Sequence, residues 1–314
     1  MKFSVITPNY NGETYLEATI ASVLKQREAG ISVEYIVVDG NSTDGSSAIL
    51  DRYERQIDVL IREDDTGAAN AINKGFACAT GDVVSWLNAD DIYWPGTLPR
   101  VVETFTGHPD ASFCFGRCPI INEEDEEIRK GITRFKEMFF PVSSRFVFQS
   151  INYVSQPSLF IRGTVLDALD GYLREDMVAA WDYELFLRLW RHGRGVLVPG
   201  GPLAAFRWHS GSISGQFFRT QFKEELDVAL EDAGKWSPQA FLHRGVRLGI
   251  IGAYSAMARM RTRSGAVHDS SAPRGKYAVP CPWRCGGHRD LSARASAGAR
   301  CALSGPCSHA LYPQ

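Results

Sequence analysis

The feature that most constrains the fold of this chain is a regular alternation of short apolar runs with helical patterns. Runs rich in Val, Ile and Leu predict four strands, at residues 3–8, 33–39, 57–63 and 81–88. Between them, apolar residues recur at helical spacing in segments 13–26, 45–54 and 67–79. Because these strands are apolar almost throughout, we expect helices to cover both faces of a mostly parallel sheet.

The pattern changes after about residue 110. Segments 111–118 and 126–132 are typical of antiparallel strands, and 132–157 is rich in loop-forming residues. Trp181–Gly193 has apolar residues on one side and predicts an amphipathic helix. Strand character returns at 195–209, and two further helices are expected at 214–234 and 238–260.

These elements predict an α/β fold, with a mostly parallel, Rossmann-like sheet flanked by helices, a smaller mixed region and C-terminal helices. We expect one large domain over residues 1–235, with halves at 1–110 and 111–235, followed by a helix at 236–262. The last segment, 263–314, shows no periodicity and is expected to be a disordered tail.

Two other interpretations of the tail stay open. It holds four of the seven cysteines, and Cys281, Cys285, His288, Cys301 and Cys307 could bind zinc, although their spacing is not the paired C-x2-C pattern. Its Arg, Gly, Ala, Ser and Pro are also what a shifted reading frame of GC-rich DNA would encode. Sequencing the gene through codon 262 decides this second question.

Charge and composition exclude several classes of protein. The formal net charge is -2, so no global field favours nucleic acid, and we expect no nucleic-acid partner. The sequence opens without a signal segment, and no apolar run reaches the roughly 18 residues of a membrane span. Cys78, Cys114 and Cys118 have no notable spacing and are interpreted as reduced thiols of a cytoplasmic protein.

Polar clusters follow each of the first four strands. They are PNYNG, DGNSTDGS, EDDTG and NADD, and in a parallel sheet such loops meet at one edge, where ligands bind. Asp90 and Asp91 end the fourth strand side by side and repel each other unless a cation or donor offsets them. One interpretation is that they cap the following helix. The other is that they bind a divalent metal, which prefers hard oxygen ligands.

Several segments in this order resemble the family-2 glycosyltransferases of the GT-A fold. They are VITPNYNG, YIVVDGNSTDGS, ANAINKG, GDVVSWLNADD, QPSLFIR and WDYELFLRL, and the resemblance covers about residues 1–235. It implies an inverting, metal-dependent enzyme that moves a sugar from a nucleotide diphosphate sugar to a hydroxyl acceptor. By resemblance, such enzymes often build cell-surface polysaccharides.

The resemblance also implies roles for individual residues. Those expected to contact the nucleotide sugar are Pro8, Tyr10, Asn11, Asp39, Asp65, Asn70, Lys74, Asn88 and Asp90. Two positions depart from the family pattern, since Gly40 stands where a second Asp is common and Asn88 stands at the first acidic position of the DxD-type stretch.

The metal, Mg²⁺ or Mn²⁺, is expected to bind Asp91, together with Asp90 and His209. Asp182 matches the catalytic base of the family, and Trp181 stands where a Glu is common. Without the resemblance, Asp182 would be interpreted as an ordinary acidic residue in the first turn of a helix. Gln156 and Trp181 are expected on the acceptor side, which takes a glycan or a lipid-linked acceptor.

Two functional alternatives and one question about the C-terminal helix stay open. An acid at the end of the second strand suits a nicotinamide-dependent dehydrogenase, but the first loop lacks the G-x-G-x-x-G pattern. The departures at Asn88 and Trp181 suit a nucleotide-sugar-binding protein that has lost activity. The basic and apolar C-terminal helix could also lie on the inner face of a membrane, or simply pack on the domain.

Overall fold

A computed structural model describes residues 1–263 of the chain. The expectations for the tail, namely disorder, a zinc site and a shifted reading frame, lie outside the described residues.

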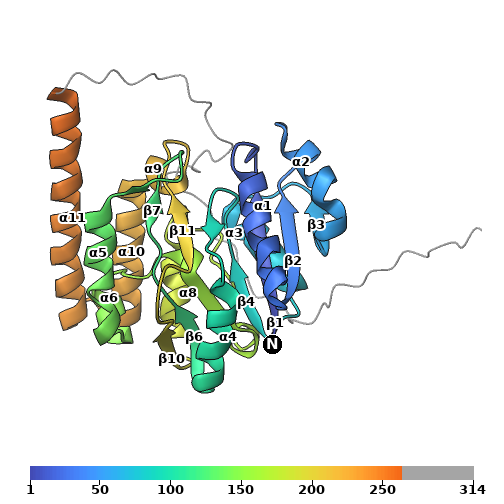
Figure 1. The fold of residues 1–314 in the computed structure, drawn as a ribbon. Coiled ribbons are helices and arrows are strands. Elements are labelled where there is room, and N and C mark those ends of the chain that lie inside the picture. Colours follow the sequence, from blue (N-terminus) through green and yellow to red (C-terminus); the bar gives the residue numbers. More distant parts are fainter. Residues whose placement is uncertain (264–314) are drawn as a thin grey trace, which may run out of the picture. The chain divides into compact units, whose positions relative to one another are not determined.

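The larger sheet has seven strands in the order β10-β6-β9-β4-β1-β2-β3 (Figure 1). Their bounds are β1 Lys2–Asn9, β2 Ser32–Asp39, β3 Val59–Arg62, β4 Val83–Trp86, β6 Ala111–Phe115, β9 Leu159–Arg162 and β10 Arg194–Leu197. Strand β9 is antiparallel to β4 and β6, and the other neighbours are parallel. The prediction of a mostly parallel sheet is therefore confirmed.

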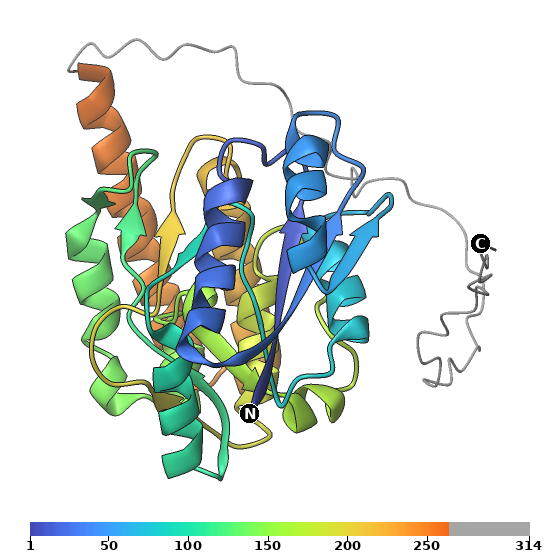
Figure 2. The ribbon, with the colours of Figure 1, turned by 45° about the vertical axis from the view of Figure 1, so that its right-hand side comes forward.

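Helices cover both faces of this sheet (Figure 2). Helices α1 (Leu16–Leu24), α2 (Ser46–Tyr53) and α4 (Thr97–Gly107) share one core with Val5, whereas α3 (Ala68–Cys78) and α8 (Trp181–Leu189) share the other with Ile6. Successive strand residues thus face opposite cores, and each fully buried Val or Ile contributes about 1.5–3 kcal/mol. The continuous apolar runs in the sequence reflect this two-sided burial.

A second sheet of four strands stands beside the larger one, in the order β5-β11-β7-β8. The bounds are β5 Ile92–Tyr93, β7 Ile120–Ile121, β8 Glu127–Ile128 and β11 Ala204–Arg207. Strand β11 is antiparallel to β5, which follows the end of β4, and parallel to β7. It therefore joins the second half of the chain to the segment that carries Asp90 and Asp91.

Three local predictions were wrong. The strand expected at 126–132 ends at Ile128, and helix α5 (Lys130–Glu137) follows it. The expected loop at 132–157 contains most of α5 and the whole of α6 (Arg145–Ser150). The strand expected at 195–209 is divided into β10 and β11, because 198–203 include Pro199, Gly200, Gly201 and Pro202.

The described chain ends in helices α9 (Ile213–Gln216), α10 (Phe218–Ala233) and α11 (Pro238–Arg263), and a short helix α7 (Gly163–Asp167) follows β9. Helices α10 and α11 lie side by side with α5 and α6 (Figures 1 and 2). Within residues 1–263, no helix combines the length and the apolar character that a bilayer crossing requires.

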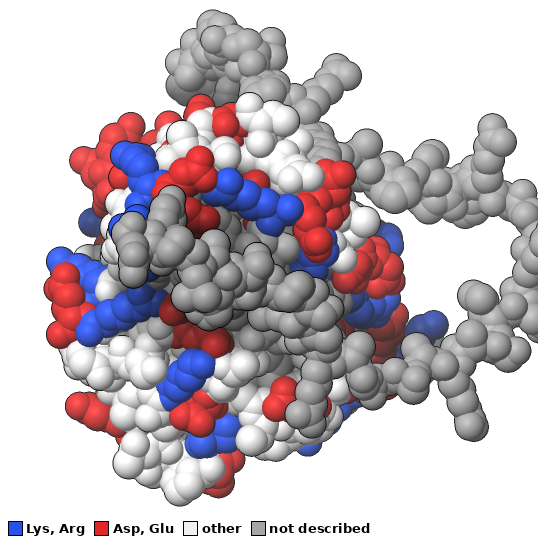
Figure 3. All heavy atoms as spheres, turned by 90° about the vertical axis from the view of Figure 1, so that its right-hand side faces the viewer, with Lys and Arg blue, Asp and Glu red and all other residues white. Residues whose placement is uncertain are grey.

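The surface near α2 and β3 carries acidic and basic side chains in mixed arrangement (Figure 3). Ion pairs such as Arg52–Glu17, with an N–O distance of 3.0 Å, and Arg62–Asp51 join neighbouring elements there. Exposed pairs of this kind contribute little to stability, about 0–1 kcal/mol each.

Candidate functional site

A cleft of about 460 Å³ lies where β1 and β4 end. This is the sheet edge at which parallel α/β folds bind ligands. The predicted site residues that line it are Pro8, Tyr10, Asn11, Asp65, Asn88, Asp90, Gln156, Trp181, Asp182 and His209. The loops after β1 and β4 and the segment after β11 thus bring together residues that are far apart in the sequence.

Asp90 and His209 form a pair of potential metal ligands in this cleft. The Nε2 atom of His209 lies 3.1 Å from Oδ2 of Asp90, and both side chains are partly exposed, 19% and 24% respectively. Tyr15 supports the imidazole, with its ring centroid 5.3 Å from that of His209. An imidazole and a carboxylate are both suitable donors for a divalent transition metal.

Asp91 occupies a different environment from its neighbour. Its side chain is fully buried, and Oδ1 accepts a hydrogen bond from the backbone N–H of Arg207 at 2.8 Å. Its Oδ2 accepts from Nδ2 of Asn88 at 3.2 Å. Burial and the adjacent Asp90 raise the pKa of Asp91 well above its usual value. Asp90 lines the cleft and Asp91 does not, and the predicted contact of Asp91 with a metal stays a prediction.

Neither aspartate caps the helix that follows, contrary to one interpretation of the sequence. Helix α4 begins at Thr97 with Gly96 at its N-cap position, and strand β5 separates it from Asp91. Asp91 instead connects the turn after β4 to two other elements. Its backbone oxygen accepts from the hydroxyl of Thr19 in α1, and its carboxylate accepts from the N–H of Arg207 in β11. The residue organises the turn that presents Asp90.

Asn88 and Gln156 form a chain of amides along the cleft. Nδ2 of Asn88 donates to Oε1 of Gln156 at 3.3 Å, and Nε2 of Gln156 donates to the backbone oxygen of Trp86 at 2.8 Å. A carboxylate at position 88 would add a third negative charge beside Asp90 and Asp91. The departure from the family pattern at this position thus suits the hydrogen bond that Asn88 donates to Asp91.

Asp39 is not among the residues that line the cleft. It is 3% exposed, and its Oδ1 accepts hydrogen bonds from Nδ2 of Asn9 and Oγ of Ser42, each at 2.6 Å. Its Oδ2 accepts from the N–H of Ser42 at 3.1 Å. The carboxylate thus fixes the loops after β1 and β2, and its predicted contact with the nucleotide stays a prediction.

Asp65 occupies the space that a side chain at position 40 would require. A Cβ atom added to Gly40 would lie 2.1 Å from Oδ2 of Asp65, which itself lines the cleft. The family often has an aspartate at position 40, and in this chain the carboxylate of Asp65, from the loop after β3, lies where that side chain would begin. A side chain at position 40 would therefore require the carboxylate of Asp65 to move.

Asn70 and Lys74 do not line the cleft. Nζ of Lys74 donates to the backbone oxygen of Asp64 at 2.7 Å and pairs with Glu63 at 2.8 Å, while Nδ2 of Asn70 donates to Glu175 at 3.0 Å. Both side chains hold loops in place, so the structure gives no support for their predicted contact with the ligand.

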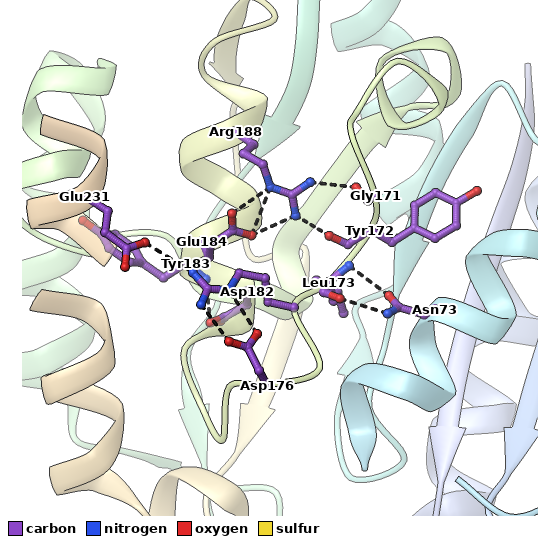
Figure 4. A network of polar contacts seen from close by, with 11 residues as sticks. Asn73, Gly171, Tyr172, Leu173, Asp176, Asp182, Tyr183, Glu184, Arg188 and Glu231 are labelled. Atoms are coloured by element: carbon purple, nitrogen blue, oxygen red, sulfur yellow. Dashed lines mark hydrogen bonds and ion pairs between the residues drawn. The ribbon is translucent and has the colours of Figure 1, made fainter. Parts of the chain in front are cut away.

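The segment before α8 is held on two sides (Figure 4). Asn73 of α3 donates to the backbone oxygen of Leu173 at 2.9 Å and accepts from its N–H at the same distance. Arg188 of α8 pairs with Glu184 at 2.8 Å and donates to the backbone oxygens of Gly171 and Tyr172. These contacts fix the position of the first turn of α8, which carries Asp182.

Asp182 lines the cleft from this first turn. Burial raises its pKa to about 6, although the N–H of Tyr183, 2.7 Å from Oδ1, and the cation of Lys136 lower it. Glu224 of α10 already accepts hydrogen bonds from the N–H groups of residues 178–180 at 2.9–3.0 Å. These N–H groups precede Trp181, the first residue of α8, so Glu224 holds the segment that leads into the helix, whereas Asp182 accepts from an N–H group of the first turn.

Lys136 of α5 was not predicted as a site residue from the sequence. It lines the cleft near Asp182, and its Nζ donates to Oγ of Ser155 at 3.3 Å. Asn152 and Gln221 also line the cleft, and both donate to Glu225 at 3.2 Å. No local motif marked these three residues. In addition, the helix that carries Lys136 was expected to be a strand and a loop.

Comparisons with known proteins identify the fold and the family. The chain is 43% identical over 108 residues to an uncharacterized glycosyltransferase of Nostoc sp., covering 33% of each chain. It is 36% identical over 132 residues to a putative teichuronic acid biosynthesis glycosyltransferase of Bacillus subtilis, covering 41% of this chain and 51% of that one. The chain thus spans between a third and about half of these two relatives.

Two solved structures share the fold. One is Staphylococcus aureus TarS in complex with UDP-GlcNAc, with a TM-score of 0.60 and 19% identity over 77% of this chain and 69% of that one. The other is a mannosyltransferase of Pyrobaculum calidifontis in complex with GDP-Man and Mn²⁺, with a TM-score of 0.56 and 18% identity over 84% of this chain and 79% of that one. Both confirm the predicted GT-A architecture.

The family model described as "Glycosyl transferase family 2" matches residues 4–169, more than half of the 314 residues. This range includes the ends of β1, β2 and β4 and the Asn88–Asp91 turn. The chain belongs to glycosyl transferase family 2.

Proposed function

We propose that this chain is an inverting glycosyltransferase that moves a sugar from a nucleotide diphosphate sugar to a hydroxyl acceptor in the synthesis of a cell-surface glycan. The observation that carries the proposal is a single cleft that holds both the Asp90–His209 pair and Asp182. Family membership supports the reaction and removes the dehydrogenase alternative. The relatives support the role in cell-surface glycans, since one is named for teichuronic acid biosynthesis.

Asp90 and His209 would hold Mg²⁺ or Mn²⁺ in this cleft. Among residues 1–263, no group of three or more His, Cys, Asp or Glu side chains could hold a metal. Two protein donors can nevertheless be enough. Mg²⁺ often binds through only one or two protein side chains and takes its remaining ligands from phosphate oxygens and water. When bound, the ion supplies Lewis-acid stabilisation of the departing diphosphate.

Asp182 serves as the general base of the proposed reaction. Its carboxylate takes the proton of the acceptor hydroxyl while that oxygen forms a bond to the anomeric carbon. The bond from this carbon to the diphosphate oxygen breaks on the opposite face, and the electron pair leaves with the nucleoside diphosphate. A pKa of about 6 keeps Asp182 ionised at neutral pH while leaving it more basic than an ordinary aspartate.

Gln156 and Trp181 lie on the acceptor side of this proposed site. Trp181 is 6% exposed, and its ring centroid lies 6.0 Å from that of Trp86, so it forms a rigid wall. The acceptor, a glycan or a lipid-linked sugar, and the expected cytoplasmic location with peripheral membrane contact stay predictions.

Release of nucleoside diphosphate from UDP-, GDP- and dTDP-linked sugars with Mn²⁺ tests the proposal. We expect Asp182→Asn to lower turnover by about 10²- to 10⁴-fold while leaving thermal stabilisation by the donor in place. Asp90→Asn should abolish the Mn²⁺-dependent part of that stabilisation. The control is Asp170→Asn, at an exposed position outside the lining of the cleft, which should change neither turnover nor thermal stabilisation by the donor. A wild-type chain that binds a donor without turnover would be the inactive binding protein, and one that binds no donor would contradict the proposal.

A further inference from the structure

The hairpin of β7 and β8 is connected to the pair of potential metal ligands, although it does not line the cleft. Its turn is fixed by Asn122, whose Oδ1 accepts hydrogen bonds from the N–H groups of Glu124 at 3.1 Å and Glu126 at 2.8 Å. Asp125 lies in this turn with a φ of 64°, in the left-handed region that aspartate and asparagine adopt more readily than most residues. Its side chain is 64% exposed. The hairpin thus holds a carboxylate at a defined place outside the cleft.

Arg207 of β11 connects this turn to Asp90. Strands β7 and β11 lie side by side (Figure 1), and the side chain of Arg207 is only 2% exposed. On the hairpin, Nη1 donates to the backbone oxygen of Asn122 at 2.7 Å, and Nη2 pairs with Oδ1 of Asp125 at 2.5 Å. Nε donates to the backbone oxygen of Asp90 at 2.9 Å. Because a guanidinium is planar and rigid, contacts at all three nitrogens determine its orientation.

Tyr15 extends this connection to His209. The central carbon of the Arg207 guanidinium lies 4.6 Å from the centroid of the Tyr15 ring, which is a cation–π contact. The centroid of the same ring lies 5.3 Å from that of the His209 imidazole, and Nε2 of this imidazole lies 3.1 Å from Oδ2 of Asp90. The guanidinium therefore contacts the backbone of one member of the pair and, through Tyr15, supports the side chain of the other.

Packing of β11 alone does not require a buried charge at this position. The backbone N–H of Arg207 already joins β11 to Asp91, and it would do so with another side chain at residue 207. Removing a guanidinium from water has a large cost, and replacing a buried ion pair by apolar side chains is often neutral or stabilising. An apolar side chain of similar length could fill the space, but it would leave the backbone oxygens of Asp90 and Asn122 without this donor. What the guanidinium adds is the connection between the hairpin and the turn that carries Asp90.

We propose that Arg207, Asp125 and Tyr15 are positioning residues for the proposed metal site. Asp125 orients the guanidinium, and the guanidinium fixes the backbone at Asp90. Tyr15 holds the imidazole of His209 beside that carboxylate. The inference rests on the proposed metal-assisted transfer and adds that side chains other than the metal ligands, one of them outside the cleft, determine how tightly the metal holds the diphosphate. Removal of such supporting contacts typically weakens metal binding about 10- to 100-fold.

Binding of a nucleoside diphosphate to the full-length protein, measured by isothermal titration with a fixed concentration of Mn²⁺ and again with EDTA, tests this inference. The probe is whichever of UDP, GDP and dTDP the wild-type protein binds most tightly. The dissociation constant in EDTA divided by that in Mn²⁺ measures the contribution of the metal, whereas a general loosening of the cleft would weaken binding in both conditions and leave this ratio unchanged. We expect Arg207→Met to lower the ratio about 10-fold or more. Asp125→Asn should lower it about 3-fold, because the exposed ion pair is only one of the contacts of the guanidinium.

Matched variants separate the proposed contacts from general effects of charge or size. Tyr15→Phe keeps the ring and should keep the ratio, whereas Tyr15→Leu should lower it about 10-fold. Glu127→Gln removes one charge from the same hairpin, at an exposed position on β8 outside these contacts, and should leave the ratio unchanged. If Arg207→Met does not fold, Asp125→Asn decides, because asparagine keeps the left-handed backbone of the turn.

An unchanged ratio in either Asp125→Asn or Tyr15→Leu would overturn the inference. Equal losses in Asp125→Asn and Glu127→Gln would overturn it too, because they would show a long-range effect of charge. The same holds for a wild-type protein that binds the nucleotide equally well with Mn²⁺ and with EDTA. Failure of the proposed function gives a different result, since the wild-type protein would then bind none of the three nucleotides, and the inference would lose its basis.

Discussion

The pH dependence of turnover is the most direct test of the proposed role of Asp182. Because burial raises the pKa of this carboxyl to about 6, about nine-tenths of it is ionised at pH 7 and only about a tenth at pH 5. If the carboxylate is the base, kcat/KM should fall about 10-fold between pH 7 and pH 5. An aspartate with its ordinary value of 3.8 would stay more than nine-tenths ionised at pH 5 and give an almost flat profile.

The assay is the initial rate of nucleoside diphosphate release between pH 5 and pH 8 with saturating Mn²⁺. Donor affinity is measured at every pH, so that loss of the metal proposed to bind Asp90 and His209 is not mistaken for protonation of the base. Lys136 gives an internal test, because its cation lowers the pKa of Asp182. In Lys136→Met the acid limb should move to higher pH, and in Lys136→Arg it should stay near its original position.

Glu225 is the competing explanation for such a limb, since burial raises its pKa to about 7. In Glu225→Gln we expect the acid limb to remain. A limb that disappears with Glu225, or a profile that is flat down to pH 5 in the wild-type protein, would refute the assignment of Asp182 as the base.

Three further predictions concern other parts of the molecule. Asp91→Ala should lower the free energy of unfolding, measured by urea denaturation, by about 1–3 kcal/mol, because it leaves the buried N–H of Arg207 without an acceptor. The control Asp90→Ala should change this free energy by less than about 0.5 kcal/mol. Gly40→Ala should weaken nucleotide binding about 10-fold by displacing Asp65, but Gly107→Ala, with nothing within 4 Å of the new Cβ, should not. Glu34→Gln should destabilise the protein by up to about 3 kcal/mol at pH 7 but not at pH 2. Burial alone would raise the pKa of Glu34, yet hydrogen bonds from Lys2, Ser4 and Thr80 lower it to about 2, so its stabilising effect is lost as pH falls from about 4.5 toward 2.

The predicted strands and helices of the first 110 residues were confirmed because their signal is local. Strands buried on both faces need continuous apolar runs, and such runs are visible in any short window of sequence. Helix α5 was missed for the opposite reason. It is only eight residues long, Thr133 is its one buried residue, and its apolar residues Ile132 and Phe135 give too short a helical pattern to recognise. Its place depends on contacts with distant parts of the chain.

The difference between Asp90 and Asp91 could not be predicted from the sequence. Both are acids at the end of a strand, and the family resemblance favoured Asp91 as the metal ligand. What separates them is the backbone of Arg207, which lies 116 residues further along and donates to Asp91 alone. A hydrogen bond between residues so far apart leaves no trace in local spacing, so only the folded chain distinguishes the buried carboxylate from the accessible one.

Strand β11 explains why the two halves of the chain must act together. The N–H of Arg207 binds the carboxylate of Asp91 at 2.8 Å, and its Nε donates to the backbone oxygen of Asp90 at 2.9 Å. Two residues later His209 reaches the carboxylate of Asp90. The match to the family model ends at residue 169, so Asp182, Arg207 and His209 all lie beyond it. The turn after β4 is thus organised by residues outside the matched segment, and nucleotide binding should depend on β11 as much as on the strands that the family model identifies.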